Sequence, residues 1–213
     1  MKLIRKSAET AENAANTALA QANAALAQAN ATMLAERAYV KISHPAPGIK
    51  QLDISGNIWF TIAVKNYGRT PARVTDVVVK PVVVPHGDPL PKNPDYYGVA
   101  IKLPSRPLRA FLVTGEEFFD SRFYSISTNE VIKVKDLASD LYMIGFVDYI
   151  DQFGQRYRSG YARIYYPMVD VKKIDQNEAD YTARNNLGVV AQEGYNYDRP
   201  RSRGEGKDWN EIS

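Results

Sequence analysis

Residues able to do acid–base or metal chemistry are few and scattered in this chain of 213 residues. The chain has no cysteine, which rules out a thiolate nucleophile, a disulfide and a cysteine metal site. Its two histidines, His44 and His86, lie near prolines in expected loops, without the spacing to carboxylates that marks a metal site. No glycine-rich phosphate loop and no Gly-x-Ser-x-Gly elbow is present. We therefore expect no catalytic residue, no cofactor and no metal site.

Carboxylates near turns are the remaining candidates for chemistry. Asp148 and Asp151 flank an expected hairpin turn, where a carboxylate pair could serve acid–base chemistry or bind calcium. Glu116 and Glu117 follow Gly115 in an expected loop. Acidic residues beside turns more often accept hydrogen bonds from the backbone, and we favour that structural role here.

A stretch of alternating basic and aromatic residues, 156–166, is the strongest candidate for ligand binding. Aromatic and basic side chains interleaved on a sheet can stack bases and hold phosphates. The alternative is that its tyrosines line the protein interior while its arginines face water. A net charge of +3 is too small to favour nucleic acid by itself. With two tyrosines of a preceding proline-rich loop, the candidate binding residues are Tyr96, Tyr97, Arg156, Arg158, Tyr161 and Arg163.

The first element expected to position such residues is a long N-terminal helix. Residues 7–40 contain no glycine or proline and are dominated by alanine, the best helix former. The seven residues from Ala18 are repeated identically from Ala25, so each repeat presents the same helical face. The expected seam consists of Leu19, Leu26, Met33 and Val40, with Ala22 and Ala29 beside it. We expect self-association as a coiled coil or docking on a partner helix; folding back onto its own chain, or a solvated spacer, are the alternatives.

Beyond residue 38 the apolar pattern changes to the period of two that is typical of strands. A strand is expected in each of the segments 39–42, 57–65, 73–84, 108–113, 128–134, 142–149 and 156–166, with Pro81 marking a bend or a sheet edge. About seven short strands separated by turns predict an antiparallel, immunoglobulin-like β-sandwich, with a barrel as the alternative.

These patterns divide the chain into four parts. We expect a heptad helix over 1–37, a β-sandwich over 38–167, a partly ordered extension over 168–191 with a short helix at 176–185, and a flexible tail over 192–213. The loop 85–97 carries several prolines and is expected to run over the surface. No signal peptide and no transmembrane segment is expected in this chain.

Three short motifs carry a resemblance to a known group of proteins. They are Glu36-Arg-Ala-Tyr-Val40 after the helix, the turn Asn66-x-Gly-x-Thr-Pro-Ala72, and the hairpin Gly145-x-x-x-Tyr-x-Asp-x-Phe-Gly154. Over roughly residues 36–166 the chain resembles a broad group of uncharacterised bacterial envelope proteins. The resemblance implies a helical spacer followed by a β-sandwich, usually behind a membrane helix that this chain lacks. It favours a place at the cell envelope, with the cytoplasm as the alternative. It implies no activity and no active-site residues.

The function expected from these features is a non-enzymatic structural or interaction module. The helix would serve as a stalk or oligomerisation element, and the β domain would bind a protein partner. The alternative from a different class is nucleic-acid or polyanion binding through the strand 156–166. A carbohydrate-active or hydrolytic enzyme built on a sandwich is a third hypothesis, which would require two carboxylates in one cleft.

Overall fold

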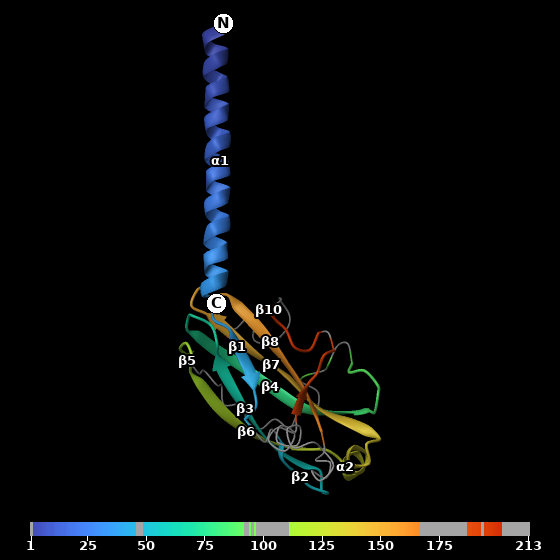
Figure 1. Cartoon of the computed structure of the whole chain (residues 1–213). Helices are drawn as coiled ribbons and strands as arrows, with labels where there is room; N and C mark the ends of the chain where they lie inside the picture. The colour runs from blue at the N-terminus through green and yellow to red at the C-terminus, as the bar shows by residue number, and fades with distance from the viewer. Residues whose placement is uncertain are drawn as a thin grey trace, which may run out of the picture. The chain divides into compact units, whose positions relative to one another are not determined.

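The computed structural model describes residues 2–45, 49–91, 94, 96, 111–166, 187–192 and 194–201. Contacts within the chain divide it into two compact units, Met1–Arg37 and Ala38–Ser213, and each is described by itself. The first unit is one helix, and the second is built on two antiparallel β-sheets (Figure 1). The expectation of a mainly β protein with an N-terminal helix is therefore confirmed.

Helix α1 spans Lys2–Glu36, a run of 35 residues. Leu19, Leu26 and Met33 of the expected seam lie on it and are exposed. The extension of the seam to Val40 is wrong, because Val40 is the first residue of strand β1, which overlaps the strand expected over 39–42, and it pairs with Asn66. Strand pairing thus outweighs the helical spacing after Glu36. In the described part of the chain, no helix is both long and apolar enough to cross a membrane.

The first sheet is organised around strand β3, Asn57–Asn66. Strand β1, Val40–Ser43, pairs with the second half of β3, and strand β2, Ile49–Leu52, pairs with its first half. Strand β6, Glu117–Ser125, pairs with β3 along its other edge. Ile58, Phe60, Ile62 and Val64 are buried, as the alternation along β3 predicted.

The second sheet is organised around strand β7, which pairs with β4 on one side and β8 on the other. Strand β4, Ala72–Pro85, pairs with the short strand β5, Phe111–Leu112, and with β7, Ser139–Asp151. Strand β8, Arg156–Tyr165, follows β7 through the expected hairpin. Strands β9, Leu187–Val189, and β10, Asp198–Pro200, both pair with β8.

The facing sides of the two sheets form one hydrophobic core. Val40, Phe60 and Tyr124 of the first sheet belong to the same buried cluster as Val77 and Tyr149 of the second. A smaller cluster covers the outer face of the second sheet, where Leu90 and Tyr195 pack over Ile144 and Ala162. The second sheet is thus covered on both faces, which explains why β7 is buried along nearly its whole length.

The strand expected over 128–134 is wrong, because these residues form helix α2, Thr128–Lys135. Ser127 accepts a hydrogen bond from the Glu130 amide, and the Glu130 carboxylate accepts one from the Ser127 amide, which is a capping box. Val131 and Val134, three residues apart, are its buried side chains. Leu137 follows at φ 58°, in the left-handed position that glycine usually fills at a helix end.

Other segments also differ from the sequence expectations. Glu117 begins strand β6 instead of lying in a loop, and β6 was not predicted at all. Residues 198–200, inside the expected flexible tail, form strand β10. Their order follows from pairing with β8, a long-range contact that local composition does not encode. The helix expected at 176–185 lies outside the described residues.

Candidate interaction surfaces

Residues of the expected basic and aromatic strand, now β8, do not form one exposed surface. Arg158 and Tyr161 are only 5% and 1% exposed. Arg158 lies on the outer face of the second sheet, and its guanidinium carbon is 3.7 Å from the centre of the Phe146 ring. Tyr161 points the other way, into the core, where its hydroxyl is 3.2 Å from His44 Nδ1 and burial raises its pKa. These two residues therefore cannot contact a large ligand.

The remaining predicted binding residues are also dispersed. Arg163 is partly buried and donates a hydrogen bond of 3.0 Å to the Asn196 side chain. Arg156 is partly buried on the same strand. Tyr96 packs edge-to-face on Phe146 with ring centres 5.2 Å apart, and burial raises its pKa. Tyr97 lies outside the described residues.

Asp148 is the centre of a buried charge cluster. Its carboxylate accepts two hydrogen bonds from Arg158, at 2.7 and 2.8 Å, and lies 3.1 Å from Arg201 Nη1. A two-pronged contact of this kind fixes the orientation of both side chains. Asp148 therefore ties β7 to β8 and to the chain after β10, and its oxygens are occupied by arginines.

The other chemistry candidates have structural partners. Asp151 Oδ1 accepts hydrogen bonds from the Phe153 and Gln155 amides, both at 2.9 Å, which is the expected turn role. His86 Nδ1 lies 3.0 Å from Asp140. Glu116 accepts a hydrogen bond of 3.0 Å from the Val113 amide. No group of three metal-binding side chains occurs among the residues that the structure describes.

Asn66, the first residue of the Asn66-x-Gly-x-Thr-Pro-Ala72 turn, is fully buried. Its amide nitrogen donates to the carbonyls of Thr70, at 2.8 Å, and Leu112, at 3.1 Å. Its oxygen accepts from the amides of Gly68, at 2.9 Å, and Tyr39, at 3.3 Å. One side chain thus joins the residue before β1, the turn and β5, which gives this motif a structural explanation.

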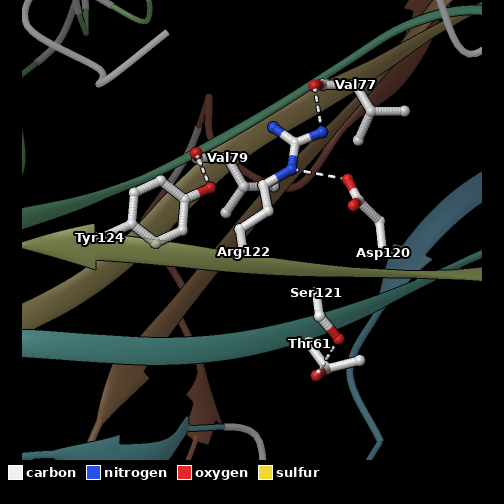
Figure 2. Close-up of polar contacts among 7 residues, drawn as sticks. All are labelled: Thr61, Val77, Val79, Asp120, Ser121, Arg122 and Tyr124. Carbon is white, nitrogen blue, oxygen red and sulfur yellow. Dashed lines mark hydrogen bonds and ion pairs between the residues drawn. The ribbon is translucent and has the colours of Figure 1, made fainter. Parts of the chain in front are cut away.

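Strand β6 is joined to β4 of the opposite sheet by side chains (Figure 2). Arg122 donates a hydrogen bond of 2.8 Å to the Val77 carbonyl and one of 2.7 Å to the Asp120 carboxylate. The Tyr124 hydroxyl donates a hydrogen bond to the Val79 carbonyl. Burial raises the pKa of Tyr124 to about 12. These contacts occupy the edge of β4 that faces away from β7. Pro81 lies along the same edge because residues two apart direct their peptide groups to the same side.

The outer face of the first sheet carries exposed aromatic side chains. Trp59 is 45% exposed, Phe119 61% and Phe123 41%. Trp59 and Phe123 are paired across β3 and β6, and their rings meet edge-to-face at 6.3 Å. Thr61 and Ser121 lie between these aromatics on the side of β6 opposite Arg122 and Tyr124 (Figure 2). Sequence reasoning missed this face because β6 was not predicted.

Comparison with known proteins adds no relative. No family model matches the chain, and no curated protein matches it.

Proposed function

We propose that the chain is a non-enzymatic interaction module in which α1 drives self-association and the β domain binds a protein. The observation that carries the proposal is the exposed row of large apolar side chains at seven-residue intervals on α1: Leu19, Leu26 and Met33. Such a row is the contact surface of a coiled coil. Ala22 and Ala29 beside it allow two helix axes to approach closely.

The expected association is weak. Burying a large aliphatic side chain is worth roughly 1.5–3 kcal/mol, and two helices would bury three such residues each. Association costs about 4–15 kcal/mol in lost freedom. The gain and the cost are therefore comparable, and we expect a dimer that dissociates on dilution within an accessible concentration range.

Light scattering coupled to size-exclusion chromatography tests this proposal on the full chain. We expect the parent protein to increase in mass with concentration and Leu26→Glu to remain a monomer. Gln28→Glu adds the same charge on another face of α1 and should behave like the parent. A parent chain that stays monomeric at every concentration would remove the self-association and leave α1 as a stalk.

For the β domain, we propose the immunoglobulin-like arrangement. The strand order supports it: β1, β3 and β6 form one sheet, and β4, β7 and β8 form the other. This is the division of strands A, B, E and C, F, G in that fold. An experimental structure of the domain with a different strand order would exclude it.

The absence of an enzyme function is also proposed. In the described structure the Asp148 carboxylate contacts Arg158 and Arg201, and the Asp151 carboxylate accepts hydrogen bonds from turn amides. Polyanion binding through β8 loses support, since Arg158 and Tyr161 are buried. Association with a bacterial envelope rests on the motif resemblance alone, and fractionation of cells producing the protein would test it.

A further inference from the structure

The outer face of the first sheet combines an aromatic end with a basic end. Alternation along β3 and β6 directs Trp59, Phe119 and Phe123 away from the core. Toward the other end of β3, Lys65 lies on the same face, and its cross-strand partner on β1 is Lys41. We call these five residues the aromatic–basic face.

The centre of this face is preformed. Thr61 and Ser121 are cross-strand partners whose hydroxyl oxygens lie 2.9 Å apart, so each satisfies the other (Figure 2). Thr61 is 5% exposed and Ala63 is 3% exposed, so neither needs a ligand to be covered. A partner would therefore meet a rigid sheet with aromatic side chains standing out from it. Rigid aromatic anchors of this kind dominate the binding energy of protein interfaces.

At the basic end, Lys65 lies between Lys41 on β1 and Glu117 on β6. Like charges directly opposite on neighbouring strands destabilise a sheet. The Lys41 amine lies 4.6 Å from the centre of the Tyr39 ring, and the Lys65 amine 5.6 Å from that of Tyr67. Among the residues that the structure describes, neither lysine makes an ion pair with a carboxylate. A carboxylate supplied by a partner would relieve the repulsion.

We propose that the aromatic–basic face binds a protein segment that carries apolar or aromatic side chains followed by carboxylates. Apolar groups would cover Trp59, Phe119 and Phe123, and the carboxylates would pair with Lys41 and Lys65. A nucleic acid fits less well, because the face offers only two lysines and Glu117 lies directly across from Lys65. This inference rests on the proposed protein-binding role of the β domain and names its surface and partner class.

A phage-displayed library of random twelve-residue peptides, panned on the immobilised full chain, tests the inference. We expect enriched peptides to combine aromatic or aliphatic residues with Asp or Glu. Their affinity, measured by calorimetry, should fall at least tenfold in Trp59→Ala and in the double variant Lys41→Glu, Lys65→Glu. Raising the salt concentration should weaken binding to the parent and have less effect on the double variant.

Matched controls separate this face from the rest of the surface. Phe153→Ala removes a turn aromatic that is 41% exposed, and Lys133→Glu with Lys135→Glu reverses two exposed lysines of α2. Both should bind the peptides within twofold of the parent. Thermal unfolding followed by circular dichroism verifies that each variant is folded.

Three results would overturn the inference. The first is that panning on the parent enriches no peptides beyond those found with the triple variant Trp59→Ala, Phe119→Ala, Phe123→Ala. The second is that the enriched peptides bind this triple variant as tightly as the parent. The third is that a single-stranded oligonucleotide binds the parent more tightly than any peptide and that Trp59→Ala abolishes this binding. Light scattering on the same samples keeps the two proposals distinct. Concentration-dependent mass without peptide binding would refute this face and leave the self-association of α1 intact.

Discussion

Single residues with every polar atom engaged hold the turns of the β domain in place. The Asn66 side chain makes four hydrogen bonds, with the residue before β1, with its own turn and with β5. A buried donor or acceptor that loses its partner costs about 1–3 kcal/mol. Asn66 therefore has a larger effect on stability than its size suggests, and the Asn-x-Gly-x-Thr-Pro pattern is primarily a structural signature.

We predict that Asn66→Ala lowers the free energy of unfolding by about 2–4 kcal/mol, because several buried backbone groups lose their partner at once. Urea denaturation followed by tryptophan fluorescence measures the change. Asn129→Ala, at an exposed position of α2, is the matched control and should stay within about 0.5 kcal/mol of the parent. Equal stability of the two variants would show that the Asn66 contacts contribute nothing.

At the scale of elements, sequence patterns identified the strands that carry long alternating or continuous apolar runs. Strands β3, β4, β7 and β8 were predicted within a few residues of their ends. Strand β6 was missed because Glu117, Asp120 and Arg122 interrupt its apolar pattern. Asp120 and Arg122 bind each other, and Arg122 also binds a β4 carbonyl, which only the tertiary structure reveals.

Helix α2 was mistaken for a strand because its short apolar run fits both periods. The available signal was the capping box, a serine followed three residues later by glutamate. The aromatic–basic face could not be predicted without β6. Strand β8 was expected to be exposed because local sequence does not show that residues 194–201 pack over it. Local patterns thus give the strands, while the side on which each is covered depends on distant segments.

The contact of Tyr124 on β6 with β4 should make the free energy of unfolding fall at alkaline pH. Burial raises the pKa of Tyr124 from its ordinary 10.0 to about 12. The native state thus favours the neutral phenol, whose contribution is complete below pH 10 and is lost as the pH rises through about 12. Urea denaturation between pH 7 and 12 should show this decline.

Tyr124→Phe should remove part of the alkaline decline. At pH 7 it should also lower the free energy of unfolding by about 1–2 kcal/mol, since the Val79 carbonyl loses its donor. Tyr67→Phe, at a tyrosine that is 53% exposed, is the control and should change neither quantity. An identical pH profile for the parent and Tyr124→Phe would contradict the prediction.

At the scale of the whole β domain, the chain after β9 returns to the second sheet and is fastened there. The amide of Gly160 donates a hydrogen bond of 2.7 Å to the Tyr197 carbonyl. A Cβ atom at position 160 would lie 2.5 Å from the Tyr197 ring. Only glycine permits this approach. The Tyr149 hydroxyl donates a hydrogen bond of 2.8 Å to the Asp198 carboxylate, and Arg201 forms an ion pair with Asp148. Residues 194–201 are therefore part of the folded domain.

We predict that Asp148→Ala lowers the free energy of unfolding by about 3–5 kcal/mol, because it leaves two buried guanidinium groups without their carboxylate. Arg201→Ala should cost less, about 1–3 kcal/mol, since Asp148 keeps both bonds to Arg158. Amide hydrogen exchange should show faster exchange over 194–201 in both variants. Equal destabilisation by the two substitutions would mean that Asp148 acts mainly through Arg201.

The side-chain contacts along β4 also affect how one molecule meets another. Residues 77–84 read Val-Val-Val-Lys-Pro-Val-Val-Val, a segment well suited to cross-β aggregation apart from its lysine and proline. Aggregation through an edge strand begins when its free carbonyls and amides pair with a strand of a second molecule. Arg122 and Tyr124 occupy two of those carbonyls, and Pro81 has no amide to offer. The native protein thus shields its most aggregation-prone segment, and detachment of β6 is the event that would expose it.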